Sequence, residues 1–373
     1  DNIFQAIGCV AYALCLSSFH QESPGNCFMK VLIVKVSALG DVVHALPVLA
    51  YLKSADPDMQ IDWLVEQDFS PFLDDHPLID NLYRIDTRAW RKSGVKASLH
   101  GALSIIRDVR KSRYDCVLDL QGNAKSAMFT LSSGAPLRFG FDRGGVRESP
   151  NLLATNRKVP LSANDYHVTD RSLAIARTAF PDGTEIINAG PLPVSDAAAM
   201  QVVQKLNAEN FSGLPLVVLH YGTTWVTKHW PLISWQALAN KLIDELGIRP
   251  VLTWGNDQEL SAVQSIQRAC NNGALVWPRG SLKDLTALLA RADLVVGSDT
   301  GPIHIAAAVG TSTVSIFRVT DPKRNAPRGS NHSHVSTAMD CSACLRKTCE
   351  LDTECGLSIP VDTVFTMIKT HLS

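Results

Sequence analysis

Four short segments of the chain place hydroxyl, glycine and charged residues directly after apolar runs. They are residues 222–231, 254–259, 278–281 and 298–304. In open α/β sheets, ligands bind at the carboxyl ends of the strands, which is where such segments lie. The first holds the hydroxyls of Thr223 and Thr224 and a lysine ahead of a helix that we expect to begin with Pro231 at its first position. Hydroxyls, backbone amides and one cation are the groups that bind a diphosphate.

The other three segments add groups that suit a nucleotide. Segment 254–259 carries a carboxylate after a tight turn, which can hold a ribose diol, and segment 278–281, with Gly280, can frame a base. In 298–304, Asp299 can cap the next helix or accept a ribose hydroxyl, and Gly301 lets a ligand approach the backbone. His304, three residues after Gly301, lies on the same face of that helix. The alternative for each segment is an ordinary capped turn, with His304 as a core histidine.

The first half of the chain has a counterpart at residues 37–41. Asp41 stands at a helix N-terminus, where it is either an N-cap or a general base that takes a proton from an acceptor hydroxyl. Basic residues gather in loops of this half and indicate an acceptor with carboxylate or phosphate groups, the alternative being a solvated basic face. These residues are Lys35, Arg88, Arg91, Lys92, Lys125, Arg143 and Arg147.

Strands, turns and helices alternate from Met29 onward, which predicts parallel sheets with helices on both faces. A segment rich in proline and glycine, residues 180–194, is the best linker candidate. We therefore expect two doubly wound domains that face a central cleft, residues 29–190 and 191–345. In the first, a single helix over 42–54 is expected to kink at Pro47.

Composition limits the class of protein. The 373 residues, 46% hydrophobic and 19% charged, suit a globular protein of two domains, and the net charge of −1 gives no support for a nucleic-acid partner. Neither a G-x-G-x-x-G nor a G-x-x-x-x-G-K-[S/T] motif occurs, which argues against the common dinucleotide and P-loop folds.

Two regions stand apart from the body of the chain. Residues 1–28 are apolar from 3 to 19 but lack a basic region ahead, so we expect an extension outside the fold, with a weak membrane anchor as the alternative. Four cysteines crowd together at Cys341, Cys344, Cys349 and Cys355, either as a metal site or as free thiols. Their spacing is not that of a zinc ribbon, and the sequence gives no sign that they take part in catalysis.

Three motifs together resemble the lipopolysaccharide heptosyltransferases of glycosyltransferase family nine. They are Lys-Val-Leu-Ile-Val-Lys-Val-Ser-Ala-Leu-Gly-Asp at 30–41, Thr-Thr-x3-Lys-His-Trp-Pro at 223–231 and Ser-Asp-Thr-Gly-Pro-Ile-His at 298–304. The resemblance runs from about Met29 to the C-terminal helix. Segments 87–92 and 228–231 are most similar to heptosyltransferase I.

The resemblance implies a GT-B fold of two Rossmann-like domains, with residues 346–373 returning to the first domain. It implies that ADP-heptose binds the second domain without a metal or other cofactor. By motif match, Glu259 would hold the ribose, and the diphosphate and heptose would be held by Thr223, Thr224, Lys228, Asp299, Thr300, Gly301 and His304. Asp41 would be the base, and the acceptor would meet Lys35, Ser37, Arg88, Arg91, Lys92 and Arg143.

The implied reaction is transfer of heptose, with inversion, to a Kdo residue of lipid A-Kdo at the cytoplasmic face of the inner membrane, by a protein that is soluble or in peripheral contact with that membrane. The nearest alternative is heptosyltransferase II or another family member with a different acceptor. An alternative of another class is a GT-B nucleotide-sugar epimerase or hydrolase, which needs no lipid acceptor, and a third is a non-catalytic nucleotide-sugar binding protein.

Overall fold

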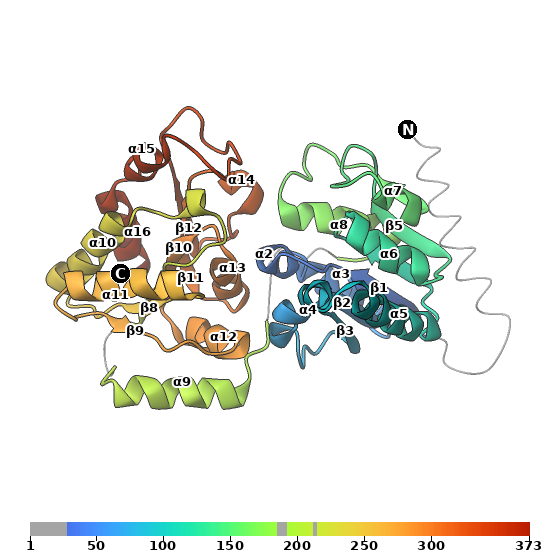
Figure 1. Ribbon diagram of the computed structural model, residues 1–373, viewed down its shortest axis with the longest axis horizontal. Helices are drawn as coiled ribbons and strands as arrows, with labels where there is room; N and C mark the ends of the chain where they lie inside the picture. Colours follow the sequence, from blue (N-terminus) through green and yellow to red (C-terminus); the bar gives the residue numbers. More distant parts are fainter. Residues whose placement is uncertain (1–27, 185–191, 212–214) are drawn as a thin grey trace. The chain divides into compact units, whose positions relative to one another are not determined.

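The structure is a computed structural model that describes residues 28–184, 192–211 and 215–373 (Figure 1). Contacts divide these residues into two units. Unit 1 holds the described residues up to 184, apart from Ala38–His44 and Pro71–Leu73. Those two short segments pack with the remainder of the chain and form unit 2 with it. The expected extension at residues 1–28 lies almost wholly outside the described residues.

Unit 1 is built on a six-stranded parallel sheet in the order β3-β2-β1-β4-β5-β6. Its strands are β1 (Lys30–Val34), β2 (Gln60–Glu66), β3 (Asn81–Ile85), β4 (Cys116–Asp119), β5 (Leu137–Phe141) and β6 (Arg157–Val159). Its helices are α3 (Pro47–Ala55), α4 (Thr87–Ser93), α5 (Val95–Lys111), α6 (Ala124–Ser132), α7 (Asn151–Ala154) and α8 (Val168–Ala179), and the 3₁₀ turn η1 (Gln67–Phe72) ends at its border with unit 2.

The central strand β1 explains the topology. Residues Val31 to Val34 are fully buried, because a central parallel strand is covered on both faces. The chain builds outward from β1 to β3 and then returns to β4 on its other side. Strand order therefore reverses between β1 and β4, which is the point where doubly wound sheets open a crevice for ligands.

The expected single helix over 42–54 is wrong. The segment forms two helices, α2 (Leu39–Val43) in unit 2 and α3 in unit 1. Pro47 is the first residue of α3. A proline there lacks the N–H that would continue the preceding helix, so it starts a new helix instead of kinking one.

Unit 2 repeats the architecture with a six-stranded parallel sheet in the order β12-β11-β10-β7-β8-β9. Its strands are β7 (Val217–His220), β8 (Val251–Thr253), β9 (Leu275–Val276), β10 (Leu294–Ser298), β11 (Ser312–Phe317) and β12 (His332–Ser336). Beside α2, its helices are α9 (Asp196–Ala208), α10 (Leu232–Leu246), α11 (Asp257–Ala269), α12 (Leu282–Arg291), α13 (Gly301–Ala308), α14 (Pro322–Asn325), α15 (Asp352–Leu357) and α16 (Val361–Leu372), with one 3₁₀ turn, η2 (Val226–Lys228). In Figure 1, α9 lies alongside α12.

The C-terminal helix differs from its expected place. Val364, Phe365 and Ile368 of α16 belong to the core of unit 2, where α16 packs against α10 and the sheet. Residues 346–373 therefore complete the second unit instead of returning to the first, because the apolar face of α16 is buried there. Pro231 also departs from expectation, since it is the extended N-cap of α10 and the helix begins at Leu232.

No helix in the described parts of the chain is long and apolar enough to cross a membrane. The apolar stretch in residues 3–19 lies outside those parts.

Candidate functional site

A largely buried chain of polar contacts joins the segments that follow β7 and β10 in unit 2. Lys228 Nζ lies 2.7 Å from Asp299 Oδ2 and also donates to the Asp299 carbonyl at 3.1 Å. His304 Nε2 lies 3.2 Å from the other carboxylate oxygen. The side chains of Asp299 and Lys228 are 4% and 16% exposed. The structure thus brings together three of the residues that the sequence proposed for one site.

The surroundings of Asp299 fix its charge. Burial alone would raise the pKa of the Asp299 carboxyl, but the His304 hydrogen bond and the Lys228 charge outweigh it and hold that pKa well below its usual range. Asp299 is therefore an anion that orients Lys228 and His304. A carboxylate does not itself bind phosphate, so its contribution to an anion site is to place the cation.

Buried hydroxyls stand without a protein partner at the same ends of the sheet. Thr223 Oγ1 follows β7, Ser298 Oγ ends β10 and Thr320 Oγ1 follows β11, and none has a hydrogen-bond partner. Buried polar atoms are normally paired, and leaving one unpaired costs free energy. A polar ligand that reaches this edge would pair them. Thr224 is exposed beside Thr223, and Thr300 is the N-cap of α13.

A second lysine meets the first around one aromatic ring. Lys228 Nζ and Lys347 Nζ lie 5.2 and 5.1 Å from the centre of the Trp225 ring, within cation–π range. Thr227 Oγ1 donates to the Arg346 carbonyl at 2.7 Å, which fixes the segment that carries Lys347. Sequence reasoning missed Trp225 and Lys347, because no spacing pattern links residues so far apart in the chain.

The segment that carries Lys347 is held to the rest of unit 2 by a buried arginine. Arg318 donates to the His229 carbonyl and to the carbonyl and carboxylate of Asp352, the last at 2.8 Å. Its side chain is 2% exposed. A Cβ on Gly356 would lie 2.5 Å from Pro231, so glycine lets the two segments pack closely.

Glu259 connects the turns after β7 and β8. Its Oε2 accepts the Gly255 amide at 2.6 Å, and a Cβ on Gly222 would lie 2.4 Å from the same oxygen. The side chain is 7% exposed. Glu259 therefore holds the turn in which the sequence expects a ribose-binding carboxylate, and Gly222 is required for the close approach.

A pocket of about 170 Å³ opens beside these turns. It is lined by Thr253, Trp254, Gly255, Trp277, Pro278, Arg279, Gly280, Ser281, Leu282, Asp284 and Leu285. Trp254 Nε1 donates to the Trp277 carbonyl at 3.0 Å, which fixes one indole against the next strand. Aromatic walls with a few polar groups suit a planar base, and Gly280, which the sequence proposes for the donor site, lies in this lining.

Helix α2, which carries Asp41, packs against α13. A Cβ on Gly40 would lie 2.8 Å from His304, and one on Gly301 would lie 2.5 Å from Leu39. The His44 and His304 rings lie 4.4 Å apart. Gly301 thus faces the Leu39 side chain, where the sequence expects a ligand, and the structure places Asp41 on a helix that contacts the one bearing His304.

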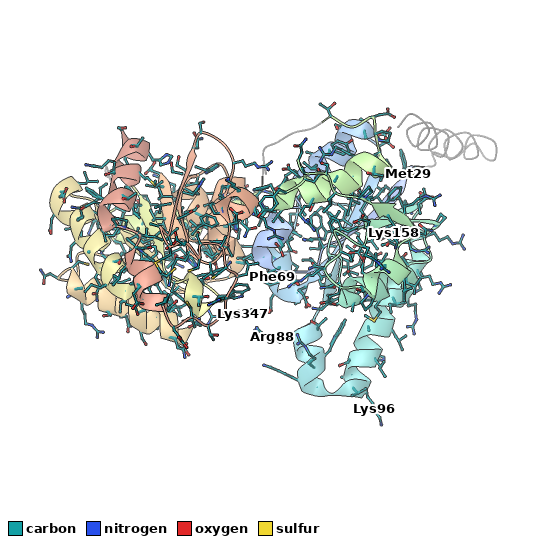
Figure 2. All side chains as sticks on the ribbon, turned by 90° about the horizontal axis from the view of Figure 1, so that it is seen from above. Met29, Phe69, Arg88, Lys96, Lys158 and Lys347 are labelled. Atoms are coloured by element: carbon teal, nitrogen blue, oxygen red, sulfur yellow. The ribbon has the colours of Figure 1, made fainter. Side chains whose placement is uncertain are left out.

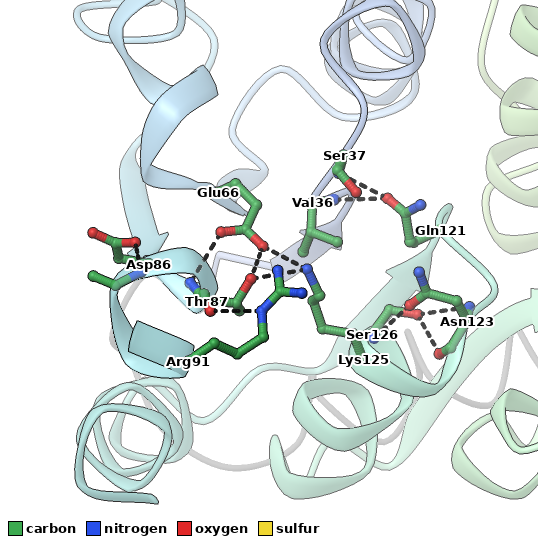
Figure 3. A network of polar contacts seen from close by, with 11 residues as sticks. Val36, Ser37, Glu66, Asp86, Thr87, Arg91, Gln121, Asn123, Lys125 and Ser126 are labelled. Carbon is green, nitrogen blue, oxygen red and sulfur yellow. Dashed lines mark hydrogen bonds and ion pairs between the residues drawn. The ribbon is translucent and has the colours of Figure 1, made fainter. Parts of the chain in front are cut away.

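Figure 3 shows the polar network of unit 1. Glu66 accepts from both the amide and the hydroxyl of Thr87, and Lys125 Nζ donates to Glu66 at 2.5 Å and to Thr87 at 3.1 Å. Arg91 Nε donates to the Thr87 carbonyl at 3.0 Å. The network ties α4 to the carboxyl end of β2 and to the first turn of α6, so Lys125 has a structural role that the sequence did not reveal.

The remaining basic residues proposed for acceptor binding differ in their exposure to solvent. Arg88, Arg91, Lys92 and Arg143 are exposed, the first pairing with Asp68 at 3.3 Å. Lys35 is buried and donates to the Leu120 carbonyl at 3.0 Å, so it connects the ends of β1 and β4 inside unit 1. The amides of Val36 and Ser37 donate to Gln121, which fixes the turn ahead of α2.

The four crowded cysteines are free thiols, and within the described ranges no group of three or more His, Cys, Asp or Glu side chains is arranged to hold a metal ion.

Unit 2 is an open parallel sheet with a cation, hydroxyls and an aromatic pocket at its carboxyl edge, the edge at which domains of the doubly wound class bind their ligands. The model of glycosyltransferase family 9 (heptosyltransferase) matches residues 102–354. The chain belongs to this family of glycosyltransferases. It is 34% identical over 322 residues to lipopolysaccharide heptosyltransferase 1 of Pseudomonas aeruginosa, covering 86% of this chain and 87% of the relative.

Two further relatives come from Escherichia coli. Lipopolysaccharide heptosyltransferase 1 of strain K12 is 32% identical over 297 residues, which cover 79% of this chain and 89% of the relative. The solved structure of E. coli heptosyltransferase WaaC with ADP aligns with a TM-score of 0.73 at 26% identity, covering 92% of this chain and all of that one. The fold is thus the GT-B type, with two Rossmann-like units, as the sequence predicts.

The charge on Asp299 gives unit 2 a measurable acid sensitivity. The pKa of Asp299 is lower in the folded protein than the ordinary value near 4, so its stabilising contribution is complete above about pH 4 and is lost as the pH falls further. We expect the unfolding free energy of the wild type to fall more steeply below about pH 4 than that of Asp299→Asn, measured by denaturant titration. Asp362→Asn, an 82% exposed control, should keep the wild-type slope. Equal slopes for wild type and Asp299→Asn would contradict the assignment.

Proposed function

We propose that this glycosyltransferase moves L-glycero-D-manno-heptose from ADP-heptose to a Kdo residue of lipid A-Kdo, a step of lipopolysaccharide inner-core synthesis. The observation that carries the proposal is the buried Lys228–Asp299–His304 chain beside unpartnered hydroxyls at the strand ends of unit 2. It supplies an oriented cation and hydrogen-bond donors for a diphosphate.

The donor would lie along the edge of the unit 2 sheet. The base would enter the Trp254–Trp277 pocket past Gly280, and Glu259 would meet the ribose. The diphosphate and heptose would lie at Lys228 and the start of α13, where the remaining donor candidates are Thr223, Thr224, Thr300, Gly301 and His304. Lys228 and the α13 dipole would stabilise the diphosphate as it leaves, so the transfer would need no metal.

The acceptor would be activated by Asp41. The carboxylate would take the proton of a Kdo hydroxyl as that oxygen attacks the anomeric carbon from the face opposite ADP, which inverts the configuration. The exposed basic residues Arg88, Arg91, Lys92 and Arg143 would meet its carboxylates and phosphates. Ser37 would contact the acceptor from the turn ahead of α2, and Lys35 would act by holding that turn.

The protein would act at the cytoplasmic face of the inner membrane in peripheral contact with it, because its acceptor is a lipid.

The decisive assay offers ADP-heptose with Kdo-lipid A, with its monoheptosylated product or with no acceptor, each in the presence of EDTA. We expect heptose transfer to Kdo-lipid A alone. Transfer to the monoheptosylated lipid would instead indicate heptosyltransferase II. Turnover of ADP-heptose without acceptor would indicate an epimerase or hydrolase. Loss of activity in EDTA that is reversed by added divalent cations would contradict the metal-free chemistry.

A further inference from the structure

Helix α5 in unit 1 exposes an apolar stripe. Val95, Leu99 and Leu103 are 77%, 59% and 57% exposed. Residues four positions apart lie on one face of a helix, so the three side chains form a continuous row roughly 12 Å long at 1.5 Å per residue. A row of this kind on a surface indicates a contact with something outside the unit.

The core of unit 1 does not account for this stripe, because α5 buries a different face. Ala102 and Val109 are buried, and Ile105 and Ile106 pack against the core cluster around Val34 and Phe129. The helix therefore has two apolar faces, one covered by its own unit and one exposed.

Positive charge surrounds the exposed face. The hairpin of α4 and α5, residues 87–111, contains seven basic residues and one acidic residue. Lys96, Arg107 and Arg110 are exposed on α5 itself. Apolar side chains flanked by lysine and arginine on one helix are the pattern of an element that lies in the interface of an anionic membrane.

The hairpin is held in a fixed shape and stands out from unit 1. The Trp90 indole lies across Gly101, where a Cβ would come within 2.4 Å of it, and Ser98 Oγ donates to the Trp90 carbonyl at 2.9 Å. Figure 2 shows the hairpin projecting from the rest of its unit, with Lys96 at its tip and Arg88 on α4. Its basic and apolar groups are thus presented together.

We propose that the α4–α5 hairpin docks the protein on an anionic phospholipid bilayer, with Val95, Leu99 and Leu103 entering the headgroup region and the basic residues meeting lipid phosphates. This inference rests on the proposed function, since α4 of the same hairpin carries Arg88, Arg91 and Lys92, which we assign to a lipid-linked acceptor. Docking brings those residues to the depth at which the sugar of a membrane-embedded acceptor emerges.

The test is sedimentation of the full-length protein with vesicles of equimolar phosphatidylcholine and phosphatidylglycerol, free of acceptor. The double variant Leu99→Gln/Leu103→Gln should bind about ten-fold more weakly than the wild type, because two leucines no longer leave water. Lys96→Glu should also bind more weakly, and salt should weaken all binding. Pure phosphatidylcholine vesicles should bind the wild type poorly.

A matched control comes from another exposed apolar pair. Met200 and Val203 of α9 are 61% and 44% exposed, and Met200→Gln/Val203→Gln should bind vesicles as the wild type does. All variants should melt at the wild-type temperature, since the changed side chains are exposed. The proposal would be overturned if the α5 double variant bound vesicles as the wild type does, or if the α5 and α9 double variants lost vesicle binding equally. Equal binding of the wild type to both vesicle types would also overturn it.

Transfer activity separates this inference from the proposed function. With a deacylated, water-soluble Kdo acceptor, Leu99→Gln/Leu103→Gln should keep the wild-type kcat and KM, whereas with the acceptor in vesicles its KM should rise by about the factor lost in vesicle binding. Failure of the wild type to transfer heptose to either acceptor would contradict the proposed function, but it would not affect the conclusion on membrane docking drawn from vesicle binding. Transfer with unchanged KM in vesicles would contradict the docking surface alone.

Discussion

Asp41→Asn is expected to lower kcat by about 10²–10⁴-fold while ADP-heptose affinity stays within about three-fold. Asp41 lies in the first turn of α2, where its Oδ2 accepts weakly from the Ala38 amide at 3.4 Å. Asparagine keeps the size and the capping oxygen of the side chain but cannot take a proton. Single-turnover transfer and donor binding by calorimetry, measured on the same preparation, separate the two effects.

The control for Asp41→Asn is an acid in the same kind of position. Asp170 lies in the first turn of α8, and Asp170→Asn should retain wild-type kcat. If Asp41→Asn were as active as Asp170→Asn, Asp41 would be a helix cap only and the base would have to be sought elsewhere, although family membership would be unaffected.

Lys228→Met is expected to weaken ADP-heptose binding by about 10–100-fold and to destabilise the protein by about 2 kcal/mol. The loss of binding corresponds to one charge-assisted hydrogen bond. The loss of stability arises because Asp299 stays charged and buried without its lysine. A broken buried pair typically costs about 3–5 kcal/mol. We expect a smaller loss of stability, about 2 kcal/mol, because His304 still contacts the Asp299 carboxylate.

Lys241→Met is the matched control, because Lys241 pairs with Glu245 and Asp362 on the surface of the same unit. Such exposed pairs contribute little to stability, and this variant should bind the donor normally. Unfolding titrations and donor-binding isotherms for both variants make the comparison. Normal donor binding by Lys228→Met would remove Lys228 from the diphosphate site.

Much of the fold could be predicted because its central strands are buried on both faces. The apolar runs at 31–34 and 294–297 read directly as β1 and β10, and α12 begins where Ser281 and Asp284 form a capping box. Other elements gave no such signal, among them α4 and β12. Helix α4 has no buried residue and so no apolar stripe, and β12 is a polar strand at the sheet edge.

The site could be predicted in part for the same reason. Lys228, Asp299 and His304 each follow a recognisable strand or helix start, so their meeting at one edge follows from the topology of a parallel sheet. The burial of Lys35 and the contact of Leu39 with Gly301 depend on packing between segments distant in sequence. The pairing of Lys347 with Trp225 has the same origin, and no local pattern encodes it.

The buried Arg318 guanidinium joins three stretches of the chain that are distant in sequence, so they have to be exchanged together. It binds the carbonyl of His229 and both the carbonyl and side chain of Asp352, while Gly356 closes against Pro231. A chimera that exchanges the cysteine-bearing segment with a relative therefore has to carry compatible residues at 318, 352 and 356. Otherwise it leaves a cation stranded in the interior and releases the turn that holds Lys228.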